Sequence, residues 1–293
     1  MKIKKIATAL LAGLLAVTCV LPLTACKNGT NPSDDTVVTE GKAKVKVLKM
    51  GRALASVIRT KDSTILIDTG DVEHVQDVVT YLSDKEITTI DAVIFTNYSK
   101  KCIGGMPDLL AAGFTVKAVY GPTYKKDSST YDLLKNALTS YNLTITTVGE
   151  QNELAFGDLK LTCYPAGQDY STLEDENDEG NSMAVAMDFG GNSMLFTSRV
   201  AGPRLAELTT QLNGKDFDCI MAPNFGAYDE KLPAFLTAVK AENAVIVASN
   251  SNPPAEATLK AMTSAGIHQN KIFTTNNGSV EISTDGNEFS IKQ

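Results

Sequence analysis

The chain has 293 residues, of which 43% are hydrophobic and 6% aromatic, with no tryptophan. This is enough apolar material for one sizeable core or two small ones, built mainly from Val, Ile, Leu and Ala. There are 27 basic and 34 acidic residues, and three of the basic ones fall within the first five positions, so the remainder is clearly acidic. Such a surface repels polyanions, and nonspecific binding to nucleic acid is therefore not expected.

Residues 1–25 have the pattern of a lipoprotein signal peptide. Three lysines form a basic start, and an apolar stretch follows up to residue 21. The sequence Leu23-Thr24-Ala25-Cys26 resembles a bacterial lipobox, which implies that Cys26 is lipidated and becomes the mature N-terminus. A transmembrane anchor is the alternative, but the apolar run is short for one. We therefore expect attachment to the bacterial cell membrane through N-terminal lipid, on the extracytoplasmic face.

Residues 26–44 are rich in Asn, Thr, Ser, Asp and Gly and have no periodic apolar face. This composition predicts a flexible tether. Residues 45–293 show no internal boundary and are predicted to form one domain. Three cysteines remain in it, Cys102, Cys163 and Cys219, each in a short apolar run. Buried single thiols are favoured over a disulfide framework, although one disulfide pair stays open.

The predicted domain alternates between apolar runs typical of strands and patterns with helical spacing. In its first half, strands are expected at 45–50, 53–60, 64–67, 92–95, 114–120, 143–148 and 159–164, and helices at 72–85, 106–112 and 128–140. In its second half, strands are expected at 181–185, 194–197, 217–222, 244–248 and 271–274, with helices at 204–212 and 256–265 and a final hairpin turning at Asp285-Gly286. This order favours the α/β class.

The strand at 92–95 ends in the most informative stretch of the chain. The apolar run stops at Thr96, a polar loop follows, and Ile103-Gly104-Gly105 leads into the next helix. The stretch resembles the metallo-β-lactamase superfamily, most closely the metallo-β-lactamase-like domain of ComEC-type proteins. There the strand ends Thr-His-x-His-x-Asp-His-Ile-Gly-Gly. Upstream, Leu66-Ile67-Asp68-Thr69-Gly70 matches the family's Leu-Ile-Asp-Thr-Gly. The resemblance implies a four-layer αββα sandwich.

The resemblance also implies a zinc site, but its ligand positions carry other residues. Asn97 and Ser99 stand at the first two histidines, Lys101 at the aspartate and Cys102 at the third histidine. Amide and hydroxyl groups are poor zinc ligands, and a lysine repels the ion. Ser99 and Lys101 offer one other catalytic interpretation of this loop, as a nucleophile and its base. Ordinary loop residues are favoured over it.

In the second half of the chain, too, the family's metal-ligand positions carry other residues. Arg199 stands where the family places the aspartate that bridges two metals, and Asn224 lies at its His-His-Gly turn. The whole chain has only two histidines, His74 and His268. Since a catalytic zinc normally takes three protein ligands, the supply is too small, and no metal or other cofactor is expected.

Positive charge at two metal positions allows two interpretations. Lys101 and Arg199 form either a site for an external anion or internal pairs with Asp68 or another carboxylate, and the internal pairs are favoured. Asp68 has a further structural interpretation, as the cap of the helix that follows it. The acidic run at 174–180 faintly resembles a calcium loop but lacks the closing glutamate, so a solvated loop is favoured.

Two functions therefore stay open. The first is a lipid-anchored, non-catalytic binding or interaction module whose ligand or partner the sequence does not name. The second is a hydrolase of the metallo-β-lactamase superfamily that acts on a phosphodiester or similar ester with unorthodox ligands. The first is favoured because the zinc-ligand positions are occupied by residues that do not bind zinc.

Overall fold

The computed structural model describes residues 36–149, 152–170 and 177–293. The expected signal peptide, Cys26 and most of the expected tether lie outside these residues. The described end of the tether segment packs on the domain: Arg59 donates a hydrogen bond to the Thr36 carbonyl, and Val38 is buried. Ala43 and Lys44 already belong to the first strand, so the flexible part that we expected cannot extend to residue 44.

The first sheet joins an antiparallel part to a parallel part. Its strand order is β17 (Phe289–Lys292), β16 (Val280–Thr284), β1 (Ala43–Val47), β2 (Ser56–Arg59), β3 (Thr64–Ile67), β5 (Ala92–Ile94), β7 (Val119–Gly121) and β8 (Ile145–Thr147). Pairing is antiparallel from β17 to β3 and parallel from β3 to β8. Beside it, β4 (Thr89–Ile90) pairs in parallel with β6 (Thr115–Val116).

The second sheet follows the same plan. Its strand order is β15 (Ile272–Thr274), β14 (Asn243–Ile246), β13 (Cys219–Met221), β12 (Asn192–Phe196), β11 (Ala184–Phe189), β10 (Leu159–Tyr164) and β9 (Glu153–Phe156). Pairing is antiparallel from β9 to β12 and parallel from β12 to β15. Because parallel neighbours need a crossover, helices separate these strands along the chain.

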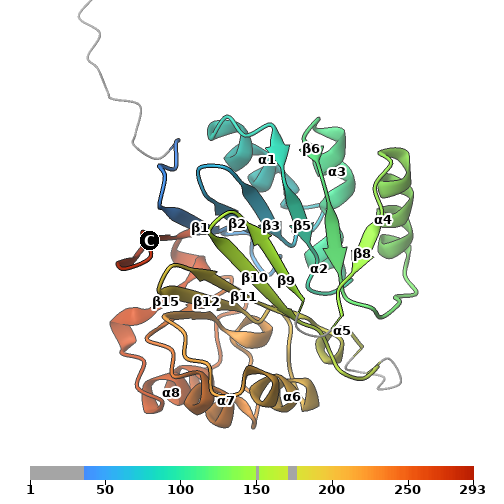
Figure 1. Ribbon diagram of the computed structural model, residues 1–293. Helices are drawn as coiled ribbons and strands as arrows, with labels where there is room; N and C mark the ends of the chain where they lie inside the picture. The colour runs from blue at the N-terminus through green and yellow to red at the C-terminus, as the bar shows by residue number, and fades with distance from the viewer. Residues whose placement is uncertain (1–35, 150–151, 171–176) are drawn as a thin grey trace, which may run out of the picture. The chain divides into compact units, whose positions relative to one another are not determined.

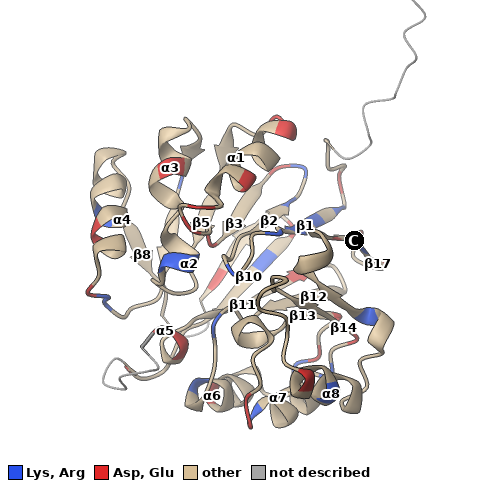
Figure 2. Ribbon diagram, turned by 180° about the vertical axis from the view of Figure 1, so that it is seen from behind, with Lys and Arg blue, Asp and Glu red and all other residues tan. Residues whose placement is uncertain are grey.

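The helices cover the outer faces of the two sheets, as Figures 1 and 2 show. Against the first sheet lie α1 (Val75–Asp84), α3 (Met106–Ala111) and α4 (Ser129–Ser140), and against the second lie α6 (Pro203–Leu212), α7 (Leu232–Val239) and α8 (Glu256–Ser264). The short elements are α2 (Lys100–Ile103), α5 (Asn177–Gly180) and the 3₁₀ turns η1 (Pro223–Gly226), η2 (Gln269–Lys271) and η3 (Thr275–Asn277). The expected αββα layering is confirmed. Among the described residues, no helix is long and apolar enough to span a bilayer.

Two apolar clusters form the core. One contains residues of both sheets and of α1, α3 and α4, and the other lies between the second sheet and α6 to α8. Strand β5 is completely buried, as its continuous apolar run predicted. Cys102, Cys163 and Cys219 are buried and unpaired, so the prediction of single thiols is confirmed.

Three local predictions differ from the structure. The expected strand at 114–120 is two short strands, β6 and β7. Helix α7 was not predicted, although Pro233 in its first turn is compatible with a helix start. Helix α1 begins at Val75 rather than 72, and its N-cap residue is His74, without a side-chain cap from Asp68. The Asp71 carboxylate accepts the His74 amide, and its carbonyl accepts the Val75 amide.

Candidate functional site

The carboxyl ends of four parallel strands meet at one edge of the sandwich. Asp68 directly follows β3, Thr96 lies just beyond β5, Ser198 just beyond β12, and Asn224 in the turn after β13. The two sheets touch here, because the hydroxyl oxygens of Thr96 and Ser198 are 2.6 Å apart. Strand ends of this kind are where α/β proteins usually place their chemistry.

A buried polar cluster fills the centre of this edge. It consists of Asp68, Thr96, Asn97, Cys102 and Ser198, each at most 2% exposed. Thr96 donates its amide to Asp68 Oδ1 (2.8 Å) and its hydroxyl to Asp68 Oδ2 (2.6 Å). When Asp68 is ionised, this uses the only hydroxyl proton of Thr96, and the Ser198 hydroxyl then donates to Thr96 Oγ1. The Asn97 amide group lies 3.3 Å from both hydroxyl oxygens.

The ionisable groups of the cluster favour their neutral forms. Burial raises the pKa of Asp68 to about 7, although the hydrogen bonds from Thr96 oppose the rise. Burial, and then the neighbouring Asp68 charge, raise the pKa of the Cys102 thiol far above its usual value. Cys102 is therefore a neutral thiol that contacts the Ser99 hydroxyl at 3.5 Å. Ser99 is bonded to this thiol rather than to Lys101, so the catalytic pair considered for this loop does not form.

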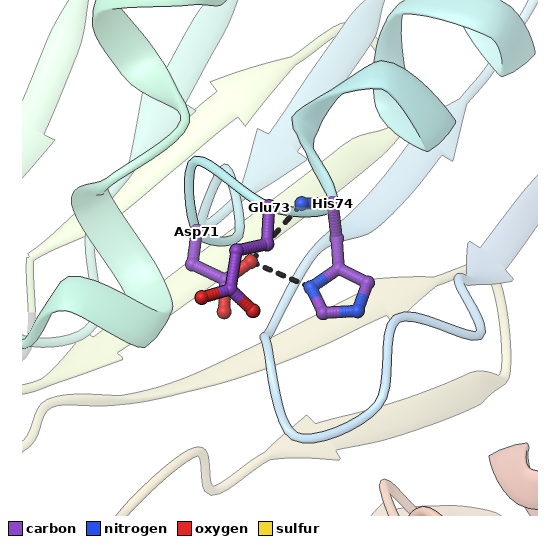
Figure 3. Close-up of side chains that lie close together, drawn as sticks. All are labelled: Asp71, Glu73 and His74. Atoms are coloured by element: carbon purple, nitrogen blue, oxygen red, sulfur yellow. Dashed lines mark hydrogen bonds and ion pairs between the residues drawn. The ribbon is translucent and has the colours of Figure 1, made fainter.

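Lys101 has an internal partner in the segment just before α1. Its ammonium lies 2.7 Å from Asp71 Oδ2, and His74 Nδ1 lies 2.6 Å from Asp71 Oδ1 (Figure 3). Burial alone raises the pKa of Asp71, but the hydrogen bonds from Lys101 and His74 outweigh it and hold the pKa below its usual value. The sequence predicted an internal pair for Lys101, and its carboxylate is Asp71 rather than Asp68.

One group among the described residues brings metal-ligand atoms close together. Oxygen or nitrogen atoms of Asp71, Glu73 and His74 lie within 4.8 Å of one another (Figure 3). Both Asp71 oxygens are already bonded, one of them to the Lys101 ammonium, and Glu73 is exposed. A metal ion here would have to displace a cation that is 2.7 Å away, so these residues do not fit one well.

The positions at which the resembling family holds zinc do not fit the ion either. They present the Asn97 amide, the Ser99 hydroxyl, the paired Lys101 and the neutral Cys102 thiol. Zinc takes thiolate, imidazole or carboxylate ligands. The carboxylate of the buried polar cluster, Asp68, has both oxygens on Thr96. In the second half of the chain, Asn224 lies in η1, where its backbone N–H donates to the Ser198 carbonyl. The second histidine, His268, is exposed just before η2.

A charged rim of Arg52, Lys126, Asp178, Glu179 and Arg199 borders the buried polar cluster. Arg199 Nη2 donates to Glu179 Oε1, and Arg199 Nη1 lies 3.8 Å from Asp178 Oδ2. The Lys126 ammonium is 3.1 Å from the same Asp178 oxygen. Figure 2 shows the acidic residues of α5 in red beside this edge. The internal pair predicted for Arg199 therefore exists, with Glu179 rather than Asp68 as its carboxylate.

The acidic run at 174–180 was expected to be a solvated loop. Residues 174–176 lie outside the described residues, but Asp178 and Glu179 are in α5 and form the ion pairs of the rim. That expectation is wrong for the described part of the run. Tyr124 connects it to the strand-end loop: its hydroxyl donates to Asp178 (3.1 Å) and accepts the Tyr98 amide (2.6 Å).

Arg52 and Phe225 are site residues that the sequence did not reveal. The guanidinium carbon of Arg52 lies 4.4 Å from the centroid of the Phe225 ring, and that of Arg199 lies 5.9 Å from it. Burial and then the Arg199 charge lower the pKa of Arg52. Nothing in the local pattern of either residue indicates this contact, because they are far apart in the sequence.

No protein-family model and no curated protein matches the chain. Solved structures do. Over 80% of this chain and 95% of the other, it is similar to the metallo-β-lactamase fold protein YhfI from Bacillus subtilis, with a TM-score of 0.54 and 12% identity. It is similar to Igni18, a metallo hydrolase from Ignicoccus hospitalis (TM-score 0.52, 15% identity, 85% and 99% covered).

A third similar structure is a diphosphatase from the PhnP family, with a TM-score of 0.51 and 13% identity over 83% of this chain and 97% of that one. Identities this low carry the architecture and not the chemistry. Together with the two facing sheets, the outer helices and the site at the strand ends, they show that the chain has the metallo-β-lactamase fold.

Proposed function

We propose that this protein is a non-catalytic binding module, held by lipid at Cys26 on the extracytoplasmic face of a bacterial membrane. One observation carries the proposal. The hydroxyl, amide and carboxyl groups of the buried polar cluster hydrogen-bond to one another where zinc ligands are expected from the family resemblance. Hydrolysis in this fold needs a metal ion to activate water and polarise the scissile bond. Because the donors and acceptors of this cluster already bond to one another, a metal ion would bind only by breaking these hydrogen bonds.

Metal content tests the non-catalytic part of this proposal. The full chain, purified in a non-ionic detergent, is incubated with zinc, manganese and iron salts, dialysed, and subjected to elemental analysis. We expect far less than one ion per chain. Stoichiometric metal would instead support a hydrolase with unorthodox ligands. In that case Asp71→Asn and Asp68→Asn, compared with each other, would tell which group holds the ion.

Fractionation tests the anchoring part. The chain with its signal peptide intact is expected to sediment with membranes, and Cys26→Ala is expected to shift it to the soluble fraction. Cys26→Ser keeps the size and polarity of the side chain but not the thiol, and it should behave as Cys26→Ala does. Equal membrane association of all three proteins would contradict lipidation at Cys26.

A further inference from the structure

Of the two guanidinium nitrogens of Arg199 that can bind an oxyanion side by side, Nε and Nη2, only one forms a hydrogen bond. Nη2 donates to Glu179, whereas the neighbouring Nε is buried and has no hydrogen-bond partner among the described residues. Nε and Nη2 form the edge to which a carboxylate or phosphate binds through two parallel hydrogen bonds. A buried donor that lacks an acceptor destabilises the folded state, because it has lost its hydrogen bonds to water. Glu179 therefore holds Arg199 less completely than an oxyanion in the bidentate position would.

The guanidinium of Arg52 stands beside it with still fewer partners. Within the described residues Arg52 forms no ion pair, and its recorded contact is with the face of Phe225, 4.4 Å away. Arg199 approaches the same ring at 5.9 Å, and its charge contributes to lowering the pKa of Arg52. Two like charges thus share one aromatic ring, and the carboxylate that favours the charged form of Arg52 is Glu179. An added anion would lower the energy of this arrangement.

Phe225 gives this pair of cations a fixed apolar base. It lies in η1 with φ at +59°, next to Asn224 at +43°, a backbone region that a bulky residue rarely adopts. The Asn224 amide is tied to the Ser198 carbonyl at 2.9 Å, so the turn is anchored to the residue that precedes Arg199. Phe225 is only 6% exposed. The ring is therefore held in place by its turn, and two guanidinium groups from two other segments lie over it.

We propose that Arg52, Arg199 and Phe225 form a site for an oxyanion, a carboxylate or phosphate group, and that Glu179 is its internal competitor on Arg199. The proposal rests on the non-catalytic binding function proposed above and names the class of its ligand. Lys101 is not part of the site, because its charge is committed to Asp71 at 2.7 Å. Two guanidiniums favour planar or tetrahedral oxyanions over a spherical anion such as chloride.

Thermal unfolding of the full chain in a non-ionic detergent tests this site. Inorganic phosphate and citrate are titrated against chloride at equal ionic strength, because a ligand that binds only the folded state raises Tm. The wild type should be stabilised by at least one of the two oxyanions and not by chloride. Stabilisation by phosphate alone identifies a phosphate ligand, and stabilisation by citrate alone a carboxylate ligand.

Three variants test which residues produce the oxyanion-dependent rise in Tm. Arg52→Gln should abolish the oxyanion-dependent rise in Tm while changing Tm in chloride little, since it breaks no ion pair. Glu179→Gln should bind the oxyanion several-fold more tightly, because the competitor loses its charge. Lys135→Gln removes an equal charge from an exposed pair with Asp132 on α4, and it should respond as the wild type does.

Two results overturn the site. One is a wild type that neither oxyanion stabilises, and the other is an Arg52→Gln protein that responds as Lys135→Gln does. Elemental analysis and treatment with EDTA, on the same samples, distinguish failure of the oxyanion site from failure of the proposed non-catalytic function. Oxyanion stabilisation that disappears with EDTA, in protein that contains stoichiometric metal, overturns both proposals. Metal-free protein that does not respond overturns the oxyanion site alone.

Discussion

Ser198 and Arg199 are neighbours in the chain, yet they belong to two different environments. Ser198 lies in the buried polar cluster, where hydroxyls, an amide and a thiol surround one carboxyl group whose pKa is raised to about 7. Arg199 lies in the charged rim, where it forms ion pairs with Glu179 and Asp178. The difference follows solvent access, since an isolated charge is costly in the interior and a paired one is tolerable at its edge.

The largest expected effect concerns the one acidic group of the cluster. Below about pH 4 Asp68 is protonated in both the folded and the unfolded chain. Between about pH 4 and 7 only the folded chain keeps the proton, so this group lowers stability by up to about 1.4 kcal/mol per pH unit as the pH rises. Above about pH 7 the full loss is present. Asp68→Asn should therefore be more stable than the wild type at about pH 8, by a few kcal/mol.

Urea unfolding of the two proteins across this range measures the effect. Their difference in stability should shrink steadily towards about pH 4. Asp188→Asn is a suitable control, because Asp188 is partly exposed and pairs with Lys215. A difference between Asp68→Asn and the wild type that stays constant with pH would show that Asp68 does not titrate differently in the folded and unfolded chain.

The next effect tests the hydroxyl that joins the two sheets. Thr96→Val keeps the shape of the side chain but removes the donor to Asp68 and the acceptor from Ser198. Leaving buried polar groups unpaired should cost about 2 kcal/mol in the free energy of unfolding. The exposed Thr237, whose hydroxyl bonds only within α7, provides the control Thr237→Val, which should change stability by less than about 0.5 kcal/mol. Equal effects would mean that the cluster contributes no specific stability.

The elements of the fold follow from local patterns. The order of apolar runs and helical patterns predicted the α/β class, because strand burial and turn residues are encoded over a few positions. The layered sandwich was implied by the resemblance of two short stretches to the metallo-β-lactamase superfamily. Helix α7 was not predicted, although Pro233 lies in its first turn. The residue types at the positions where the resemblance implies zinc ligands can also be read directly from the sequence.

Which side chains pair with each other in the site could not be predicted from local sequence patterns. Asp68 and Asp71 lie in one turn, and the sequence does not tell which carboxylate turns inward. The positive φ of Asp68, +60°, belongs to the turn that sets its carboxylate on Thr96, whereas the Asp71 carboxylate bonds to His74 and Lys101. Arg52 and Phe225 meet only because two distant loops converge at the strand ends. Such contacts depend on tertiary geometry, which a single sequence does not display.

In the charged rim, Arg199→Ala should have a smaller effect than Thr96→Val. Glu179 and Asp178 would lose a cation, but their side chains are 18% and 13% exposed and Lys126 remains on Asp178. We expect a loss of about 1 to 2 kcal/mol in urea unfolding near neutral pH. Lys61→Ala breaks a pair with Glu40, which is 86% exposed, and should cost less than about 0.5 kcal/mol. An Arg199→Ala protein as stable as Lys61→Ala would show that the rim pair contributes nothing to folding.

The smallest effect has the opposite dependence on pH. Lys101→Ala removes one of the two groups that hold the pKa of Asp71 below its usual value of 3.8, while His74 remains. Because the folded pKa is lowered, the pair stabilises the protein above about pH 4 and loses its contribution as the pH falls further. With Lys101 30% exposed, the loss should be about 1 kcal/mol near neutral pH.

Urea unfolding should show that the stabilities of Lys101→Ala and the wild type converge at acidic pH, where those of Asp68→Asn and the wild type converge as well. Between about pH 5 and 8 the two variants should separate: the Lys101→Ala difference stays flat, and the Asp68→Asn difference grows. A Lys101→Ala difference that also grew with pH would show that Lys101 interacts with Asp68, and would contradict the assignment of Asp71 as its partner.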